Sequence, residues 1–116
     1  MTDEPWAVVS LRIDAKDLPA QEIERLLGAA SSSGSDEFWS ADLTTDRSAT
    51  LDDQLHVAKQ WLRERAAALR ALVDADVCVH IGWTPRDPQD GIIMDRELVD
   101  LLHDVRGYVL LDTYRD

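Results

Sequence analysis

Few residues of this chain have the chemistry of an active site, and the pair Cys78 and His80 is the first to consider. A thiol beside an imidazole is the arrangement of a cysteine nucleophile with its general base. The two residues stand at positions i and i+2 of an alternating segment, so they share one face of a predicted strand. They would lie about 7 Å apart, because each residue of a strand advances ~3.3 Å. That separation is too long for a direct hydrogen bond, and the pattern favours a buried cysteine that behaves as a small hydrophobic residue.

Other catalytic and metal-binding patterns are missing from the sequence. The single cysteine excludes an internal disulfide and a thiolate zinc site, and the three histidines share no metal-ligand spacing. The five glycines are too scattered for a phosphate-binding loop. The acidic segment 87–104 lacks the alternating oxygen ligands of a calcium loop. We therefore expect no catalytic residue, no metal and no cofactor, with a histidine–carboxylate site built from distant segments as the remaining alternative.

One constellation of polar residues is a candidate ligand-binding site. Arg12 and His80 fall on the side of their predicted strands that is opposite the apolar positions. Asp112 and Tyr114 join them in one of the two phases of the last strand, whose phase is ambiguous because residues 109–111 are all apolar. Strands hold such side chains rigidly, which favours a binding surface. The alternative is an ordinary cross-strand pair between Arg12 and Asp112.

The elements that must position these residues follow from the hydrophobic periodicity. Residues 6–14 and 76–83 alternate between apolar and polar positions, whereas residues 51–74 keep the spacing of a long helix that begins after a capping-box-like Thr50. Shorter helices are predicted between Pro19 and the Gly28 stop, and between the Asp95 cap and Gly107. The remaining strands are predicted at 37–43 and 108–114.

This order, β-α-β-α-β-α-β, predicts an α+β fold in a single domain of residues 1–116. We expect a four-stranded mixed or antiparallel sheet with the helices packed mainly on one face. The alternation of the first and third strands indicates that the second sheet face is less apolar, unlike a sheet covered on both sides. Trp61, beside the apolar stripe of the long helix, is interpreted as core packing or, if exposed, as an interaction hot spot.

Charge limits the classes of partner. The 23 acidic and 12 basic residues give a net charge of −11, which argues against binding nucleic acid, because neutralising phosphates requires clustered lysines and arginines. An acidic surface is compatible with a basic protein partner. No apolar run reaches the ~18 residues of a membrane helix, and the acidic start is unlike a secretory signal, so we expect a cytoplasmic protein with no membrane contact.

Several segments together resemble a family. The strand AVVSLRI, the short helix ending in LLG, the aromatic pair FW and the closing LLDTY resemble the small bacterial domain of unknown function DUF4279, over roughly residues 6–114. The serine-rich SSSGSDE stands where many such members have a basic, glycine-containing stretch. The resemblance implies a fold and carries no activity with it.

The sequence therefore favours a non-enzymatic interaction module that binds a basic protein, as an immunity-type protein would, or that forms a homodimer. The alternative is a small-ligand binder or enzyme that uses the exposed sheet face around Arg12, His80 and Asp112.

Overall fold

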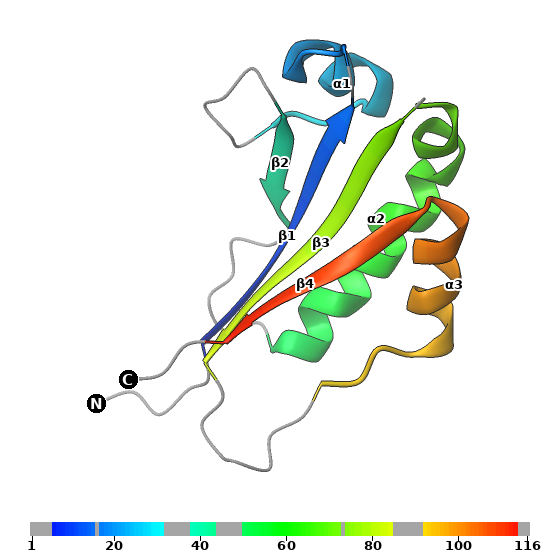
Figure 1. The fold of residues 1–116 in the computed structure, drawn as a ribbon. Helices are drawn as coiled ribbons and strands as arrows, with labels where there is room; N and C mark the ends of the chain where they lie inside the picture. The colour runs from blue at the N-terminus through cyan, green and yellow to red at the C-terminus, as the bar shows by residue number, and fades with distance from the viewer. Residues whose placement is uncertain are drawn as a thin grey trace.

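The computed structural model describes residues 6–15, 17–31, 38–43, 50–72, 74–84 and 92–113. Within these residues the elements follow the predicted order (Figure 1). They are β1 (Trp6–Ala15), α1 (Ala20–Leu27), β2 (Trp39–Asp42), α2 (Leu51–Ala71), β3 (Ala75–Thr84), α3 (Arg96–Asp104) and β4 (Gly107–Thr113).

The four strands form one mixed sheet in the order β2-β1-β3-β4. β1 pairs antiparallel with both β2 and β3, whereas β3 and β4 are parallel because α3 carries the chain back between them. Helices α2 and α3 pack side by side against one face of the sheet (Figure 1). The predicted α+β fold, a mixed sheet with helices on one face, is confirmed.

The period-two alternation of β1 and β3 separates the two sheet faces. Val9, Leu11 and Ile13 of β1 are completely buried, as are Val79 and Ile81 of β3. Successive strand residues point to opposite faces, so these side chains all lie on the helix-covered face. The residues that the helices add to this core are Ile23, Leu27, Leu55, Ala58, Leu62, Ala66, Leu69, Leu98 and Leu102.

Local sequence signals set the helix ends. The Thr50 hydroxyl accepts a hydrogen bond from the Asp53 amide and the Asp53 carboxylate accepts one from the Thr50 amide, so the predicted capping box is confirmed. Asp95 caps α3 by accepting from the Leu98 amide. Gly28 ends α1 with a φ of 69°, a left-handed conformation that glycine adopts without a steric penalty.

The side chain of Gln54 replaces a missing strand partner of β1. β2 pairs with residues 10–13 of β1, and within the described part of the chain no strand lies on that side of the first half of β1. Gln54 is 2% exposed; its Oε1 accepts from the Val9 amide at 2.9 Å and its Nε2 donates to the Ala7 carbonyl at 2.8 Å. These bonds satisfy buried backbone groups and fasten α2 to the edge of β1.

Some element boundaries differ from the predictions. α2 ends at Ala71 instead of near residue 74, because the chain turns at Asp74, which has a φ of 55°. The strand predicted at 37–43 is limited to Trp39–Asp42 within the described residues. Trp61 is partly buried, with its ring 5.4 Å from the fully buried Trp39, in agreement with its interpretation as core packing.

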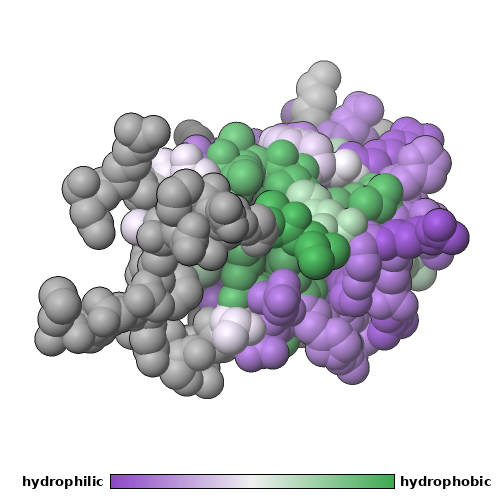
Figure 2. Space-filling model, turned by 90° about the horizontal axis from the view of Figure 1, so that it is seen from below, coloured by the Kyte–Doolittle hydropathy of each residue, from purple (hydrophilic) through white to green (hydrophobic). Residues whose placement is uncertain are grey.

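Hydrophobic residues also reach the surface at one end of the molecule. Viewed from below, they form a continuous patch over the end where α2 begins (Figure 2). Ile93, which precedes α3, is 76% exposed and is the most exposed large hydrophobic residue among those described. Hydrophobic side chains of the described residues are therefore more exposed at this end than between the helices and the centre of the sheet.

Candidate binding face of the sheet

The sheet face opposite the helices, called the open face below, carries the candidate site. It displays the alternate residues of β1 and β3 that do not enter the core, together with Tyr108, Leu110 and Asp112 of β4. A hollow of about 450 Å³ lies on this face, lined from all four strands and by Phe38, which precedes β2. The rigid sheet forms its floor, so the lining side chains have fixed origins.

Three of the four predicted site residues lie on the open face. Arg12 and His80 line the hollow, and β4 takes the phase that brings Asp112 to the same side. Tyr114 lies outside the described residues. Because β3 separates β1 from β4, Arg12 and Asp112 are not neighbours, and the cross-strand pair considered as the alternative is wrong. The Arg12 guanidinium instead lies 3.9 Å from the centre of the Phe38 ring.

Asp112 contacts His80, and the two side chains form the best-defined polar pair of the open face. His80 Nε2 and Asp112 Oδ2 are 2.7 Å apart. Ser10 is paired with His80 on the other side, whereas Asp112 is in register with Gly82 and reaches His80 diagonally. The Ser10 hydroxyl, however, donates its proton to Asp42 Oδ1 at 2.8 Å. The serine–histidine bond that activates a nucleophile is therefore not formed.

Cys78 lies in the same hollow, between Arg12 and Tyr108 on the neighbouring strands. It is a free thiol that is only 4% exposed, so the prediction of a buried cysteine is confirmed. Burial raises the pKa of the Cys78 thiol and outweighs the opposing effect of its hydrogen bond with Tyr108. The thiol stays protonated at neutral pH and is a poor nucleophile.

Tyr108 and Leu110 are large exposed residues of this face that the sequence pattern did not indicate, and it also did not indicate Phe38, Asp42 and Asp76 in the lining of the hollow. Tyr108 and Leu110 are 46% and 48% exposed, although both are large and partly or wholly apolar. The Tyr108 hydroxyl donates to Asp76 Oδ2 at 2.9 Å, and this bond to a carboxylate raises the pKa of Tyr108 to about 12. Once Asp112 is assigned to the open face, Tyr108 and Leu110 follow, because residues 108, 110 and 112 of one strand share a face.

Carboxylates outnumber cations around the hollow. Asp14, Asp42 and Asp76 line it, and among the described residues its basic lining side chains are Arg12 and His80. Asp112 adds a fourth carboxylate through its contact with His80. The open face thus shares the acidic character of the whole chain, and it combines this charge with an exposed aromatic and an exposed aliphatic side chain.

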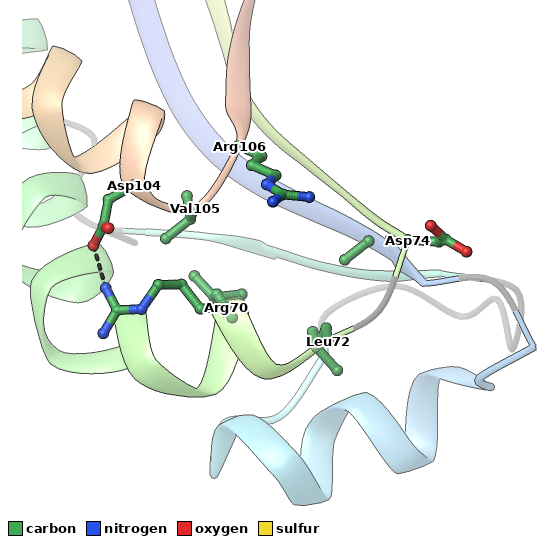
Figure 3. A pocket seen from close by; sticks show the side chains of 8 residues that line it. Arg70, Leu72, Asp74, Asp104, Val105 and Arg106 are labelled. Carbon is green, nitrogen blue, oxygen red and sulfur yellow. Dashed lines mark hydrogen bonds and ion pairs between the residues drawn. The ribbon is translucent and has the colours of Figure 1, made fainter.

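A second hollow of about 420 Å³ lies where α2 and α3 end (Figure 3). Arg70 and Asp104 point toward one another there and form an ion pair, while Asp74 and Arg106 occupy left-handed turns that lead into β3 and β4. The hollow has two arginines and two aspartates in its lining, so its formal charges balance. Its described lining therefore does not share the acidic excess of the open face.

Comparisons with protein-family models, with curated proteins and with solved structures found no match to this chain. The resemblance to DUF4279 therefore stays a prediction. Within the described ranges, no group of three or more histidine, cysteine, aspartate or glutamate side chains is placed to hold a metal ion. No helix in that part of the chain combines the length and the apolar character needed to cross a bilayer.

Proposed function

We propose that this chain is a protein-interaction module whose open face binds a basic surface on another protein. The observation that carries the proposal is the composition of that face: exposed Tyr108 and Leu110 of β4 line the same hollow as Asp14, Asp42 and Asp76 of the other three strands. An apolar or aromatic centre with a polar rim is the usual anatomy of a protein interface, and tyrosine is enriched at its centre.

Electrostatics supports a basic partner. The net charge of −11 creates a long-range field that accelerates the approach of a positively charged protein. At the surface itself, lysines or arginines of the partner would meet the carboxylates that line the hollow, while Tyr108 and Leu110 would supply apolar contact. Two open faces of this chain, in contrast, would bring like charges together. A basic partner is therefore favoured over face-to-face self-association, and an immunity-type protein that blocks a basic toxin is one form of this function.

The geometry offers less support to a catalytic function. The second candidate function is binding of a small ligand in the hollow. The contact between His80 and Asp112 favours it, because it holds the imidazole where it could exchange a proton with such a ligand. The neighbouring Ser10 hydroxyl is bonded to Asp42 and the Cys78 thiol is buried and protonated. Neither group is prepared for nucleophilic attack, which favours binding over catalysis.

The proposal is tested with a lysine-rich peptide that also carries leucine and tyrosine, titrated into isotopically labelled protein and followed by NMR. We expect the largest amide shifts in β3 and β4 around the hollow. The triple variant Asp14→Asn, Asp42→Asn, Asp76→Asn keeps the side-chain shapes and removes three charges. It should weaken binding at least about tenfold, because a buried or half-buried charge contact contributes on the order of 1.4 kcal/mol or more.

The matched control removes the same charge from the helices, in Asp52→Asn, Glu64→Gln, Asp100→Asn. All three positions are exposed. This variant should lose only the weak, screened part of the attraction. If both triple variants lose affinity equally, or if the shifts spread over the helices, the peptide is attracted by net charge alone and the proposed binding face is wrong.

A further inference from the structure

The outer edge of β4 has features that do not depend on the open face. β4 is the last strand of the sheet, and in the described part of the chain no strand pairs with its outer side. It has seven residues, GYVLLDT, against four in β2 at the other edge. Exposed strand edges are usually protected by lysine, proline or a bulge, and β4 contains neither lysine nor proline.

We infer that two copies of this chain associate through β4, pairing antiparallel to form one continuous eight-stranded sheet. The inference does not rest on the proposed function. The two-fold axis runs perpendicular to the sheet and passes midway between the Leu110 residues of the two copies, Leu110 being the central residue of Gly107–Thr113. The unpaired backbone amide and carbonyl groups of each β4 edge form hydrogen bonds with those of the other copy, which is the usual geometry of strand addition between protein chains.

The side chains of β4 are complementary to themselves in this register. Leu110 meets Leu110 of the second copy on the open face, and Leu111 meets Val109 on the helix-covered face. Leu110 and Leu111 are 48% and 42% exposed in the single chain, so the pairing removes apolar surface from water.

The charged residue of the strand is also well placed. Asp112 lies two residues from the centre, so its cross-strand neighbour is Tyr108 of the second copy and not a second aspartate. The single proton of the Tyr108 hydroxyl is already donated to Asp76, so Asp112 of the second copy lies beside a neutral phenol instead of a second carboxylate. The local charges therefore permit this self-pairing, and the main opposing term is the long-range repulsion between two chains of net charge −11.

The repulsion gives the association a characteristic dependence on salt. Higher ionic strength screens the charges of the two copies and should strengthen the dimer. Binding of a basic partner should weaken under the same change. The two surfaces are thus distinguishable by the sign of their salt dependence, and failure of one proposal leaves the other intact.

The experiment is sedimentation velocity of the full chain over a range of concentrations at low and high salt. We expect a monomer–dimer equilibrium that shifts toward dimer at high salt. Leu111→Asp adds a carboxylate to the edge without changing the open face, and it should raise the dissociation constant at least about tenfold. The matched control is Val57→Asp on α2, where a valine is 40% exposed, and it should leave the dissociation constant unchanged.

A cross-link tests the register itself. In a Cys78→Ala background, Leu110→Cys should oxidise to a disulfide-linked dimer, because directly opposite residues of antiparallel strands have Cβ atoms about 4.5–5.5 Å apart. Val57→Cys in the same background should not. A wild-type chain that stays monomeric at every concentration and salt would overturn the inference. So would a dimer that Leu111→Asp leaves intact, or one that fails to cross-link through Leu110→Cys.

Discussion

The two faces of the sheet are built from the same strands and have opposite roles. On β1, Leu11 is completely buried under the helices, whereas its neighbour Arg12 is exposed on the open face. On β3, Val79 is completely buried and His80 is only half-buried. The covered sides of β1 and β3 carry no polar residue, and the open face gathers four carboxylates around Arg12 and His80. Residues one position apart along a strand therefore belong either to the core or to the proposed binding face, so changes on the open face need not disturb the core.

The largest difference between the faces should appear in adjacent alanine variants. Leu11→Ala removes a fully buried side chain and should lower the free energy of unfolding by ~2–5 kcal/mol, because lost burial and a cavity add together. Ser10→Ala breaks only an exposed hydrogen bond to Asp42 and should cost less than about 1 kcal/mol. Urea denaturation measures both. Equal losses would mean that the open face contributes to the core after all.

An intermediate effect is expected where a polar residue enters the covered side. Gln54→Leu leaves the Val9 amide and the Ala7 carbonyl without their partner and should cost ~1–3 kcal/mol, although leucine is the more hydrophobic residue. Gln60→Leu on the exposed side of the same helix is the control and should change the stability by less than about 0.5 kcal/mol. If Gln54→Leu raises the midpoint of thermal unfolding, the hydrogen bonds from Gln54 to β1 do not stabilise the protein.

The smallest effect should be a change in the alkaline titration of Tyr108 on the open face. Tyr108 has its pKa raised from 10.0 to about 12 by its bond to Asp76, so the folded state holds this proton more tightly than the unfolded chain does. The corresponding contribution to stability is complete below pH 10 and is lost as the pH rises through about 12. In a Tyr114→Phe background, the ultraviolet absorbance of tyrosinate reports Tyr108 alone.

Asp76→Asn removes the carboxylate that holds the Tyr108 proton, so the Tyr108 pKa should fall toward its ordinary value of 10.0. Asp42→Asn, which removes a carboxylate of the same hollow from β2 at the opposite edge of the sheet, is the control and should shift the Tyr108 pKa much less. An unchanged titration in Asp76→Asn would show that the hydrogen bond is not what protects the phenol.

Several parts of the fold were predictable because they depend on local patterns. The alternation of residues 6–14 and 76–83 identified β1 and β3 and the side of each that is buried. Thr50 with Asp53, and Asp95 alone, marked the starts of α2 and α3, since capping side chains bond only to amides two or three residues away. The α+β class followed from the order of these elements.

The candidate site was less predictable because its contacts join distant strands. Arg12, His80 and Asp112 could each be placed on a polar face, but their mutual distances depend on the strand order β2-β1-β3-β4. With β3 between them, Arg12 contacts Phe38 and Asp112 contacts His80. The phase of β4 was ambiguous for a local reason, since apolar residues at 109–111 fit either side of a strand.

The sequence by itself determined which residues form strands and helices, which sides of β1 and β3 are apolar and where α2 and α3 begin, because each depends on residues a few positions apart. The tertiary structure decided that Asp112 meets His80, that Gln54 of α2 closes the edge of β1, and that Tyr108 and Leu110 remain exposed beside an acidic hollow. Those outcomes depend on strand order and on the packing of segments more than 30 residues apart, such as His80 with Asp112 and Gln54 with Val9, which no local pattern specifies.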